Sequence, residues 1–269
     1  MAALDTVFHD LHRQGLLMLA NVGDAGGARL VERLGSKAVA TSSAAMAWNH
    51  GYQDGNKLPL ELLRSTIASM TRVLSVPLTV DIEGGYSDDP AQVANVIDAV
   101  IAAGAVGVNI EDGVGSPDLL IRKVDAARKV AERHGVNLFV NVRCDVYLKN
   151  LLPAEQRLEE LLKRAAQYAN AGADGLFAAG VVEPHEIAAV CRESRLPVNL
   201  LWRAGLAAPD ELQRLGVRRL SAGSAIAEFL YGAMGGLARS FLEHGHLDTQ
   251  ALKAHTYGEL NSLMAPRAE

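Results

Sequence analysis

The chain has 269 residues, of which 49% are hydrophobic and 21% are charged, and its formal net charge at pH 7 is −5. Its basic residues are scattered singly or in pairs, so it lacks the clustered Lys and Arg that neutralise phosphates, which argues against a nucleic-acid partner. The length suits one domain with a large core, since α/β barrels often reach about 250 residues as a single domain.

No apolar run approaches the roughly 20 residues that a membrane helix needs, and Asp5 and His9 lie within the first segment of the chain. We therefore expect no membrane span and a cytoplasmic location. The two cysteines, Cys144 and Cys191, are too few for a disulfide framework and lack the spacing of a metal site. This cysteine usage is typical of a reducing compartment.

Short apolar strands recur along the chain, most of them after a glycine that ends a helical pattern. The first strand lies in GLLMLANVG from Gly15, and later ones lie in RLGSKAVATSS, AAGAVGVNIED, RHGVNLFVNVRCD, NAGADGLFAAG and RLGVRRLSAGS. A glycine just past a helix accepts the left-handed cap conformation, and the apolar run after it suits a buried parallel strand. Two more strands begin at Pro77 and Pro197, where a missing N–H is tolerated. The pattern therefore predicts eight strands.

Amphipathic stretches long enough for crossover helices separate these strands, for example AQVANVIDAVIAAG and AEQRLEELLKRAAQYANAG. Eight strand and helix units predict an α/β fold, a (β/α)₈ TIM barrel formed by residues 1–269 as one domain, with a C-terminal helical extension over about 225–269. The alternative is a doubly wound open sheet, which more often has about five or six strands. No GxGxxG motif follows the first strand here.

Charged residues close several of the predicted strands. In such barrels the catalytic face lies at the C-terminal strand ends. There the sequence places Asp81 and Glu83 after the third strand, Glu111 after the fourth and Arg143 after the fifth, whereas the last three strands end with little charge. Carboxylates gathered with one arginine indicate a metal-assisted site for small acids.

Five segments resemble the isocitrate lyase and phosphoenolpyruvate mutase superfamily: TSSAAMAWNHGYQDG, VDIEGGY, GVNIEDG, VNVRCDVYL and NAGADGLF, in order and spacing from about Leu17 to Gly223. The resemblance implies a barrel that binds Mg²⁺, with Mn²⁺ as an alternative, and a small 2-oxo or 2-hydroxy acid, and that passes through an enolate. It also implies exchange of the last helices between subunits, and hence a homodimer or homotetramer.

The resemblance assigns the metal site to four acids. Asp81 matches the direct magnesium ligand, Glu83 and Glu111 match acids that hold the metal's waters, and Asp54 matches a further outer acid. This division is physically reasonable, because Mg²⁺ keeps several waters and takes one or two carboxylates directly. The alternative for each acid is to cap the following helix or to pair with a lysine.

The substrate carboxylate is placed, by the same resemblance, at the turn formed by Ser42, Ser43 and Ala44. Successive backbone N–H groups in a turn form an anion-binding concavity, which small residues keep accessible. Arg143 would complete the clamp, since a guanidinium grips a carboxylate or a developing enolate oxygen bidentately. The alternative for Arg143 is a salt bridge to Asp145 or to the fourth-strand acid.

The segment after Glu111 departs from the superfamily pattern. Lyases of the superfamily carry a longer mobile loop there, with a lysine and a Lys-Cys-Gly-His signature, whereas this chain reads IEDGVGSPDLLIRKVDAARKV. Lys123 falls in the next predicted helix, and Cys144 is expected to point to the opposite face of its strand from Arg143. Without the loop cysteine, isocitrate-type cleavage loses its usual acid, and without the lysine, phosphoryl migration lacks support.

The remaining residues favour an enzyme, a Mg²⁺-dependent lyase that cleaves a C–C bond of a small 2-oxo or 2-hydroxy acid. The alternatives are an oxaloacetate-type decarboxylase, a carbon–phosphorus bond enzyme of the phosphonopyruvate type, and a 2-oxo acid binder without chemistry. Tyr86, His50 and a metal-bound water held by Glu83 or Glu111 are candidates for proton transfer, although a surface or contact role is expected more often for His50. Asn199 and Trp202 are candidates to shape the pocket, and a place in the core or at an interface is an equal alternative for Trp202.

The stretch AIAEFLYGAMGGLARSFLEHGHLDT near the C-terminus combines small and apolar residues in a helical pattern. Such a helix could dock against its own barrel or exchange with a neighbouring subunit, and the family resemblance favours exchange. His244 and His246 are two positions apart, unlike the spacing that puts two ligands on one helix face, so they indicate a helix end and not a zinc site.

Overall fold

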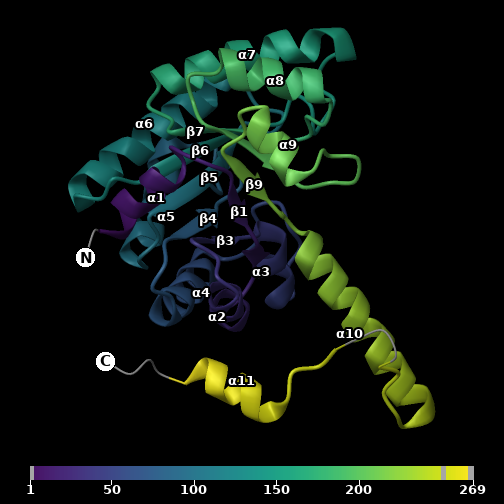
Figure 1. Ribbon diagram of the computed structural model, residues 1–269. Coiled ribbons are helices and arrows are strands. Elements are labelled where there is room, and N and C mark those ends of the chain that lie inside the picture. The colour runs from purple at the N-terminus through teal and green to yellow at the C-terminus, as the bar shows by residue number, and fades with distance from the viewer. Residues whose placement is uncertain (1–2, 250–252, 266–269) are drawn as a thin grey trace.

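The computed structural model describes residues 3–249 and 253–265 and shows a barrel of parallel strands surrounded by helices (Figure 1). The strands are β1 (Leu17–Leu19), β2 (Asn21–Val22), β3 (Val39–Thr41), β4 (Leu78–Asp81), β5 (Gly107–Glu111), β6 (Phe139–Cys144), β7 (Gly175–Ala178), β8 (Val198–Leu201) and β9 (Arg219–Ser221). The helices are α1 (Leu4–Leu11), α2 (Ala25–Arg33), α3 (Ser43–Asn49), α4 (Leu60–Val73), α5 (Pro90–Ala102), α6 (Pro117–His134), α7 (Ala154–Asn170), α8 (Pro184–Glu193), α9 (Pro209–Arg214), α10 (Ala225–His244) and α11 (Tyr257–Met264).

The strands form one sheet in the order β1-β9-β8-β7-β6-β5-β4-β3-β2, and every neighbouring pair is parallel. The predicted first strand is split at Ala20: Leu17 of β1 lies opposite Arg219 of β9, whereas Asn21 of β2 lies opposite Ala40 of β3. The two halves close the sheet, because one pairs with the last strand and the other with the second predicted strand. The predicted TIM barrel is confirmed, and the open doubly wound sheet is wrong.

Local signals explain where the helices around the barrel begin and end. α5 and α6 each start with a capping side chain followed by proline: Asp89 Oδ1 accepts from Ala91 N–H at 2.9 Å, and Ser116 Oγ accepts from Asp118 N–H at 3.2 Å. Gly135 ends α6 with a φ of +64°, the left-handed conformation that glycine adopts without strain. These caps fix where the loops leave the helices, and hence which residues reach the mouth of the barrel.

Helix α1 fills the N-terminal end of the barrel. Phe8 is 0% exposed, and its ring centroid lies 5.3 Å from that of Phe139 on β6. A Cβ on Gly107 would lie 2.7 Å from Phe8 Cε1, so a glycine is needed where α1 meets β5. His12 stacks on Phe139 with centroids 4.0 Å apart, and its Nδ1 donates to the Phe8 carbonyl at 2.8 Å. With this end closed by side chains, the opposite end is left for a ligand site.

Polar side chains fill the middle of the barrel. Arg219 is 0% exposed; its Nη2 donates to Asn109 Oδ1 at 3.1 Å and its Nε to Ser221 Oγ at 3.1 Å. Asn141 Nδ2 donates to the same Asn109 oxygen at 2.9 Å, and Ser221 Oγ donates to Asn199 Oδ1 at 3.2 Å. Burial lowers the pKa of Arg219 to about 9, because the guanidinium charge is removed from water. These bonds join β5, β6, β8 and β9 across the barrel interior.

Helix α10 extends away from the barrel, and α11 lies back near α2 (Figure 1), where Arg29 Nε donates to the Leu263 carbonyl at 3.1 Å. None of the 20 residues of α10 is buried, and Phe229 and Leu242 are 74% and 83% exposed. α10 ends at His244, so His244 and His246 lie at a helix end, as predicted. Within the described ranges, no helix has both the length and the apolar character to cross a membrane. Exchange of α10 between subunits stays a prediction.

Replacing Phe8 by alanine is expected to lower the free energy of unfolding by about 3–5 kcal/mol, the usual cost of deleting a fully buried phenylalanine ring. Urea denaturation of both proteins measures this difference. Leu4→Ala, at a position of α1 that is 39% exposed, is the matched control and should cost less than about 1 kcal/mol. Equal losses for the two variants would show that α1 does not close the barrel through Phe8.

Candidate active site

The third predicted strand, β4, ends in an acid at the mouth of the barrel. Asp81 N–H donates to Thr41 Oγ1 at 2.9 Å, and Asp81 Oδ1 accepts from Glu83 N–H at 3.1 Å. These bonds fix the carboxylate between the ends of β3 and β4. The charge of Asp54 acts on both Asp81 and Glu83, and the charge of Asp81 acts on Glu83, so the structure brings three of the predicted metal-site acids together.

Two loops meet over these acids. Asn56 N–H donates to Glu83 Oε2 at 2.5 Å, and Asn56 Oδ1 accepts from Tyr86 N–H at 3.1 Å. Asn56, from the loop between α3 and α4, therefore holds the loop that follows β4. Asp54 lies in the same α3–α4 loop and is exposed.

Backbone strain is concentrated at the same end of the barrel. Four described residues other than glycine have a positive φ: Asn56 (59°), Glu83 (53°), Tyr86 (62°) and Asn150 (49°). All four belong to loops that follow C-terminal strand ends or pack on them. Non-glycine residues in this conformation cost about 1–3 kcal/mol each, and such strain is typical of functional sites. The location of these residues thus marks the mouth as the functional end.

Arg143, at the end of β6, is held by two acids. Its Nε and Nη2 donate to the two carboxylate oxygens of Asp145 at 2.8 and 3.0 Å, and it forms a close ion pair with Glu111 of β5. Burial alone would lower the pKa of Arg143, but Glu111, Asp145 and Asp81 outweigh this effect and raise it. The alternative predicted for Arg143, a salt bridge to neighbouring acids, is therefore present in the structure, and substrate contact stays a prediction.

The acids at the mouth of the barrel have raised pKa values. Burial raises the pKa of Glu83 to about 7, aided by the charges of Asp54 and Asp81. Burial likewise raises the pKa of Glu111 to about 7, against the opposing effect of Arg143. The pKa of Asp81 is raised for the same reason, with Arg143 again acting against burial. Such a set gains free energy when a cation approaches, because the cation favours the ionised carboxylates.

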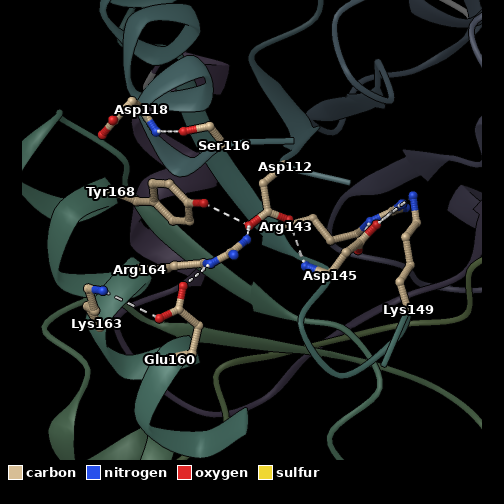
Figure 2. Close-up of polar contacts among 10 residues, drawn as sticks. All are labelled: Asp112, Ser116, Asp118, Arg143, Asp145, Lys149, Glu160, Lys163, Arg164 and Tyr168. Atoms are coloured by element: carbon tan, nitrogen blue, oxygen red, sulfur yellow. Dashed lines mark hydrogen bonds and ion pairs between the residues drawn. The ribbon is translucent and has the colours of Figure 1, made fainter. Parts of the chain in front are cut away.

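Asp112 connects this site to helix α7 (Figure 2). Its Oδ2 accepts from Arg164 Nη1 at 2.8 Å and from Tyr168 Oη at 2.7 Å, and its Oδ1 accepts from Asp145 N–H at 2.8 Å. Arg164 Nε also donates to Glu160 Oε1 at 2.8 Å. Because Asp145 in turn holds the Arg143 guanidinium, a buried chain of charge-assisted bonds runs from α7 to the mouth of the barrel.

Lys123 and Cys144, the lysine and cysteine considered as replacements for those of the longer loop, both have other surroundings. Lys123 lies in α6, where its Nζ donates to the Gly84 carbonyl at 2.8 Å and pairs with Asp88 at 3.3 Å, so it tethers the loop after β4. Cys144 is buried in the large apolar cluster, on the opposite face of β6 from Arg143, as alternation predicts. Burial raises the pKa of its thiol. Neither residue replaces the missing loop.

The predicted carboxylate turn lies at the start of α3. Ser42 is the N-cap of this helix, its Oγ accepting from Ala45 N–H at 3.3 Å, and Ser43 and Ala44 form the first turn. Ser42 therefore has the capping role that serine often takes, and its hydroxyl proton is still free to be donated. Val22 O accepts from Ser42 N–H at 3.0 Å, which fixes the turn beside β2.

Other predicted pocket residues differ in their surroundings. Asn199 lies in the barrel interior, and its Nδ2 has no hydrogen-bond partner among the described residues. Tyr86 is half-buried; burial, Glu83 and Asp81 raise the pKa of its hydroxyl. His50 Nε2 bonds Thr66 Oγ1 at 2.8 Å, a structural contact between α3 and α4. Trp202 is 48% exposed on the loop after β8.

Sequence reasoning missed three groups: the Asp112 cluster with Arg164 and Tyr168, the interior Arg219, and Lys149 on the loop after β6. Alternation could have indicated Arg219, since it and Ser221 share the inward face of β9. No local signal links Asp112 to α7. Within the described part of the chain, no set of three or more His, Cys, Asp or Glu side chains is arranged to enclose a metal ion by itself.

The raised pKa values predict how the stability of the metal-free protein depends on pH. The pKa values of Glu83 and Glu111 rise from 4.5 to about 7, so between these pH values the folded state binds more protons than the unfolded state. Stability should therefore fall as pH rises from about 4.5 to about 7. Thermal denaturation in EDTA across this range measures the slope.

The double variant Glu83→Gln, Glu111→Gln should flatten that slope, whereas the surface control Glu155→Gln should not. An unchanged slope in the double variant would show that these two acids do not titrate as their burial implies.

Known proteins are similar to this chain in both sequence and fold. The phosphoenolpyruvate phosphomutase family matches residues 8–242. An oxaloacetate decarboxylase of Paraburkholderia xenovorans is 31% identical over 232 residues, covering 80% of this chain and 73% of that protein. A 2-methylisocitrate lyase of Salmonella typhimurium is 28% identical over 187 residues, covering 64% of this chain and 61% of that protein.

Among solved structures, a proposed phosphonomutase from Burkholderia cenocepacia superposes with a TM-score of 0.83 and 38% identity, covering 88% of this chain and 99% of that one. The family match spans nearly the whole barrel, including every strand end described above. The chain belongs to the phosphoenolpyruvate phosphomutase family.

Proposed function

We propose that the protein is a Mg²⁺-dependent lyase that cleaves a C–C bond of a small 2-oxo or 2-hydroxy acid through an enolate. The observation that carries this proposal is the position of Arg143, held by Glu111 and Asp145 at the same mouth as Asp81 and Glu83. A fixed cation beside acids that resist ionisation is the arrangement that binds a metal and an anionic substrate together.

The residues present fit Mg²⁺. This ion seldom takes an all-protein cage and instead keeps waters, with one or two carboxylates as direct ligands. Asp81 would be the direct ligand, and Glu83, Glu111 and Asp54 would hold the waters. The raised pKa values of Asp81, Glu83 and Glu111 support this fit. Burial disfavours their ionised forms, and a bound cation would stabilise those forms. Mn²⁺ has the same preference for oxygen ligands and is the alternative ion.

Each residue of the site then has a defined task. Ser42, with the N–H groups of Ser43 and Ala44, binds the substrate carboxylate, and Asn199 offers its unpartnered Nδ2. Arg143 binds the oxygen on which negative charge develops. A bound Mg²⁺ supplies Lewis acidity toward the oxygens of the 2-oxo acid.

Proton transfer falls to Tyr86. Its hydroxyl stays protonated at neutral pH because burial and the neighbouring acids raise its pKa, so it can donate to the carbon that carries the developing charge. Glu111 orients the guanidinium of Arg143 during this step.

Decarboxylation of an oxaloacetate-like acid is the second candidate. It needs the same enolate stabilisation but no acid on a long loop, and the loop after β5 is short here. The 31% identity to an oxaloacetate decarboxylase supports this reading. Carbon–phosphorus chemistry comes third, because the loop lysine associated with phosphoryl migration is missing.

A screen of 2-oxo and 2-hydroxy acids for release of pyruvate, glyoxylate and CO₂, with and without Mg²⁺, tests the proposal and names the bond broken. Turnover should require Mg²⁺ and fall at least about 100-fold in Asp81→Ala, since electrostatic stabilisation of the developing charge is lost. The exposed carboxylate Asp118, replaced in Asp118→Ala, provides the control and should retain full activity.

Deuterium exchange at C3 of pyruvate distinguishes an enzyme from a binder. If no acid turns over or exchanges deuterium while 2-oxo acids still bind with Mg²⁺, the protein is a binder and the lyase proposal fails.

We also propose a homodimer or homotetramer in which α10 is covered by a second copy. α10 exposes Phe229, Leu230, Met234 and Leu242, and a hollow of about 590 Å³ beside β1 is lined by apolar residues that include Met18. Exposed apolar surface of this extent is typical of subunit contacts.

Light scattering after size exclusion measures the assembly. Phe229→Glu combined with Leu242→Glu should reduce the mass to that of one chain, because two charges would have to be buried in an apolar contact. Lys129→Glu on α6 is the control and should leave the mass unchanged. A wild-type protein of one-chain mass would contradict the proposal.

A further inference from the structure

The loop between β6 and α7 carries a lysine to the mouth of the barrel. Lys149 Nζ lies 3.3 Å from Asp145 Oδ2 and 4.0 Å from Glu111 Oε1, and its side chain is 38% exposed (Figure 2 shows it beside Asp145). Both separations exceed the roughly 2.7–3.2 Å of a good N–H···O hydrogen bond. The ammonium is therefore attracted to the two carboxylates, but it forms no close hydrogen bond with either of them.

The backbone around this lysine is fixed. Lys149 N–H donates to the Asp145 carbonyl at 2.9 Å, and Leu151 N–H donates to the Val146 carbonyl at 3.1 Å. Asn150, the next residue, has a φ of +49°, one of the four strained positions at the mouth. A turn tied this closely holds the Lys149 stem at the rim and leaves only its side chain to move.

Two other cations of the mouth are committed to protein partners. Arg143 is bonded to both oxygens of Asp145 and paired with Glu111. Lys123 is 6% exposed at its side chain and donates to the Gly84 carbonyl. Of these three cations, Lys149 alone combines exposure with uncommitted donors.

A cavity of about 280 Å³ lies beside these groups. Glu111, Lys123 and Lys149 line it together with Asn56 and Gly84, so it opens between the loops that follow α3, β4, β5 and β6. Glu111, one of the acids of the proposed site, lies in the wall of this cavity. An anionic group entering this cavity would meet Glu111, and it needs a cation to offset that repulsion.

We infer that Lys149 binds the second carboxylate of a 2-oxo diacid and thereby selects diacids over monoacids. The inference rests on the proposed function, because it concerns the far end of the same substrate. The Ser42 turn and Arg143 bind the 2-oxo acid end, while the ammonium of Lys149 offers charge-assisted hydrogen bonds to the distal carboxylate. Lys149 thus limits the substrate to acids that place an anion near the loop after β6.

The test compares oxaloacetate, a 2-oxo diacid, with pyruvate, a monoacid, for wild type, Lys149→Gln, Lys149→Arg and Lys163→Gln. Lys163 is the matched control, because it is another exposed lysine, 3.6 Å from Glu160 on α7 and outside the mouth. The readouts are kcat/KM for oxaloacetate, after subtraction of spontaneous decarboxylation in Mg²⁺, and the rate of deuterium exchange at C3 of pyruvate.

Lys149→Gln should lower the ratio of the oxaloacetate rate to the pyruvate rate about 10- to 100-fold, the range expected for loss of a charge-assisted hydrogen bond. Lys149→Arg should recover most of the ratio, and Lys163→Gln should match wild type. Binding provides a second readout: the ratio of the Kd values for malate and lactate, measured by calorimetry, should change by a similar factor.

An equal loss for both substrates would overturn the inference, since it would mean that Lys149 acts on the common end of the substrate or on the fold. 3-Phosphonopyruvate serves as a further substrate. If Lys149→Gln lowered the rate with 3-phosphonopyruvate relative to pyruvate but left the oxaloacetate ratio unchanged, the assignment to a carboxylate would be overturned. If the wild type exchanges pyruvate but Lys149→Gln leaves the ratio of the oxaloacetate rate to the pyruvate rate unchanged, the inference is refuted and the proposed function stands. A wild type that turns over no acid of the panel and does not exchange pyruvate refutes the proposed function as well.

Discussion

The balance of charge at the mouth of the barrel is the constraint on which the rest of the site depends. Parallel strands deliver Asp81, Glu111 and Arg143 to one end, where burial makes every unneutralised carboxylate costly. Arg143 neutralises part of this charge and is held by the acids it neutralises. Burial, which the nearby positive charge does not offset, raises the pKa of both Glu83 and Glu111 to about 7, and this imbalance is the physical reason for expecting a divalent cation there.

The sequence carried the architecture because its signals are local. A glycine or a proline followed by a short apolar run recurs in each unit, and charged residues close the third to fifth predicted strands, so eight strands and the acids at two of their ends could be predicted without any contact information. The split of the first strand at Ala20 could not, since it arises from pairing with two different neighbours. Asp112 finds Arg164 and Tyr168 at separations of 52 and 56 residues, and only the curvature of the barrel brings them together. The loop positions of Asn56 and Lys149 likewise depend on the positive φ angles of Asn56 and Asn150, which the sequence pattern did not indicate.

The short loop after β5 gives the site a different character from that of a barrel closed by a long mobile loop. Here the rim is fixed by hydrogen bonds: Asn56 joins the α3–α4 loop to the loop after β4, Lys123 ties α6 to the loop after β4, and Asp112 anchors the turn after β6 to α7. A rim built in this way supports electrostatic preorganisation, in which the dipoles and charges are in place before the substrate arrives. Selection among acids then depends on which fixed groups the far end of the substrate meets.

Closure of the barrel through its first strand has a consequence for how the chain folds. Asn21 Oδ1 accepts a hydrogen bond from Gly223 N–H across 202 residues, and β1 lies against β9, so the sheet stays open at one edge until the last strand is available. Contacts of such long separation slow folding, because a large loop must be closed before they form. During synthesis, the nascent chain would expose the unpaired edges of β1 and β8 to solvent until β9 leaves the ribosome. Until then these edges could pair with other chains, so chaperones would be needed to protect them.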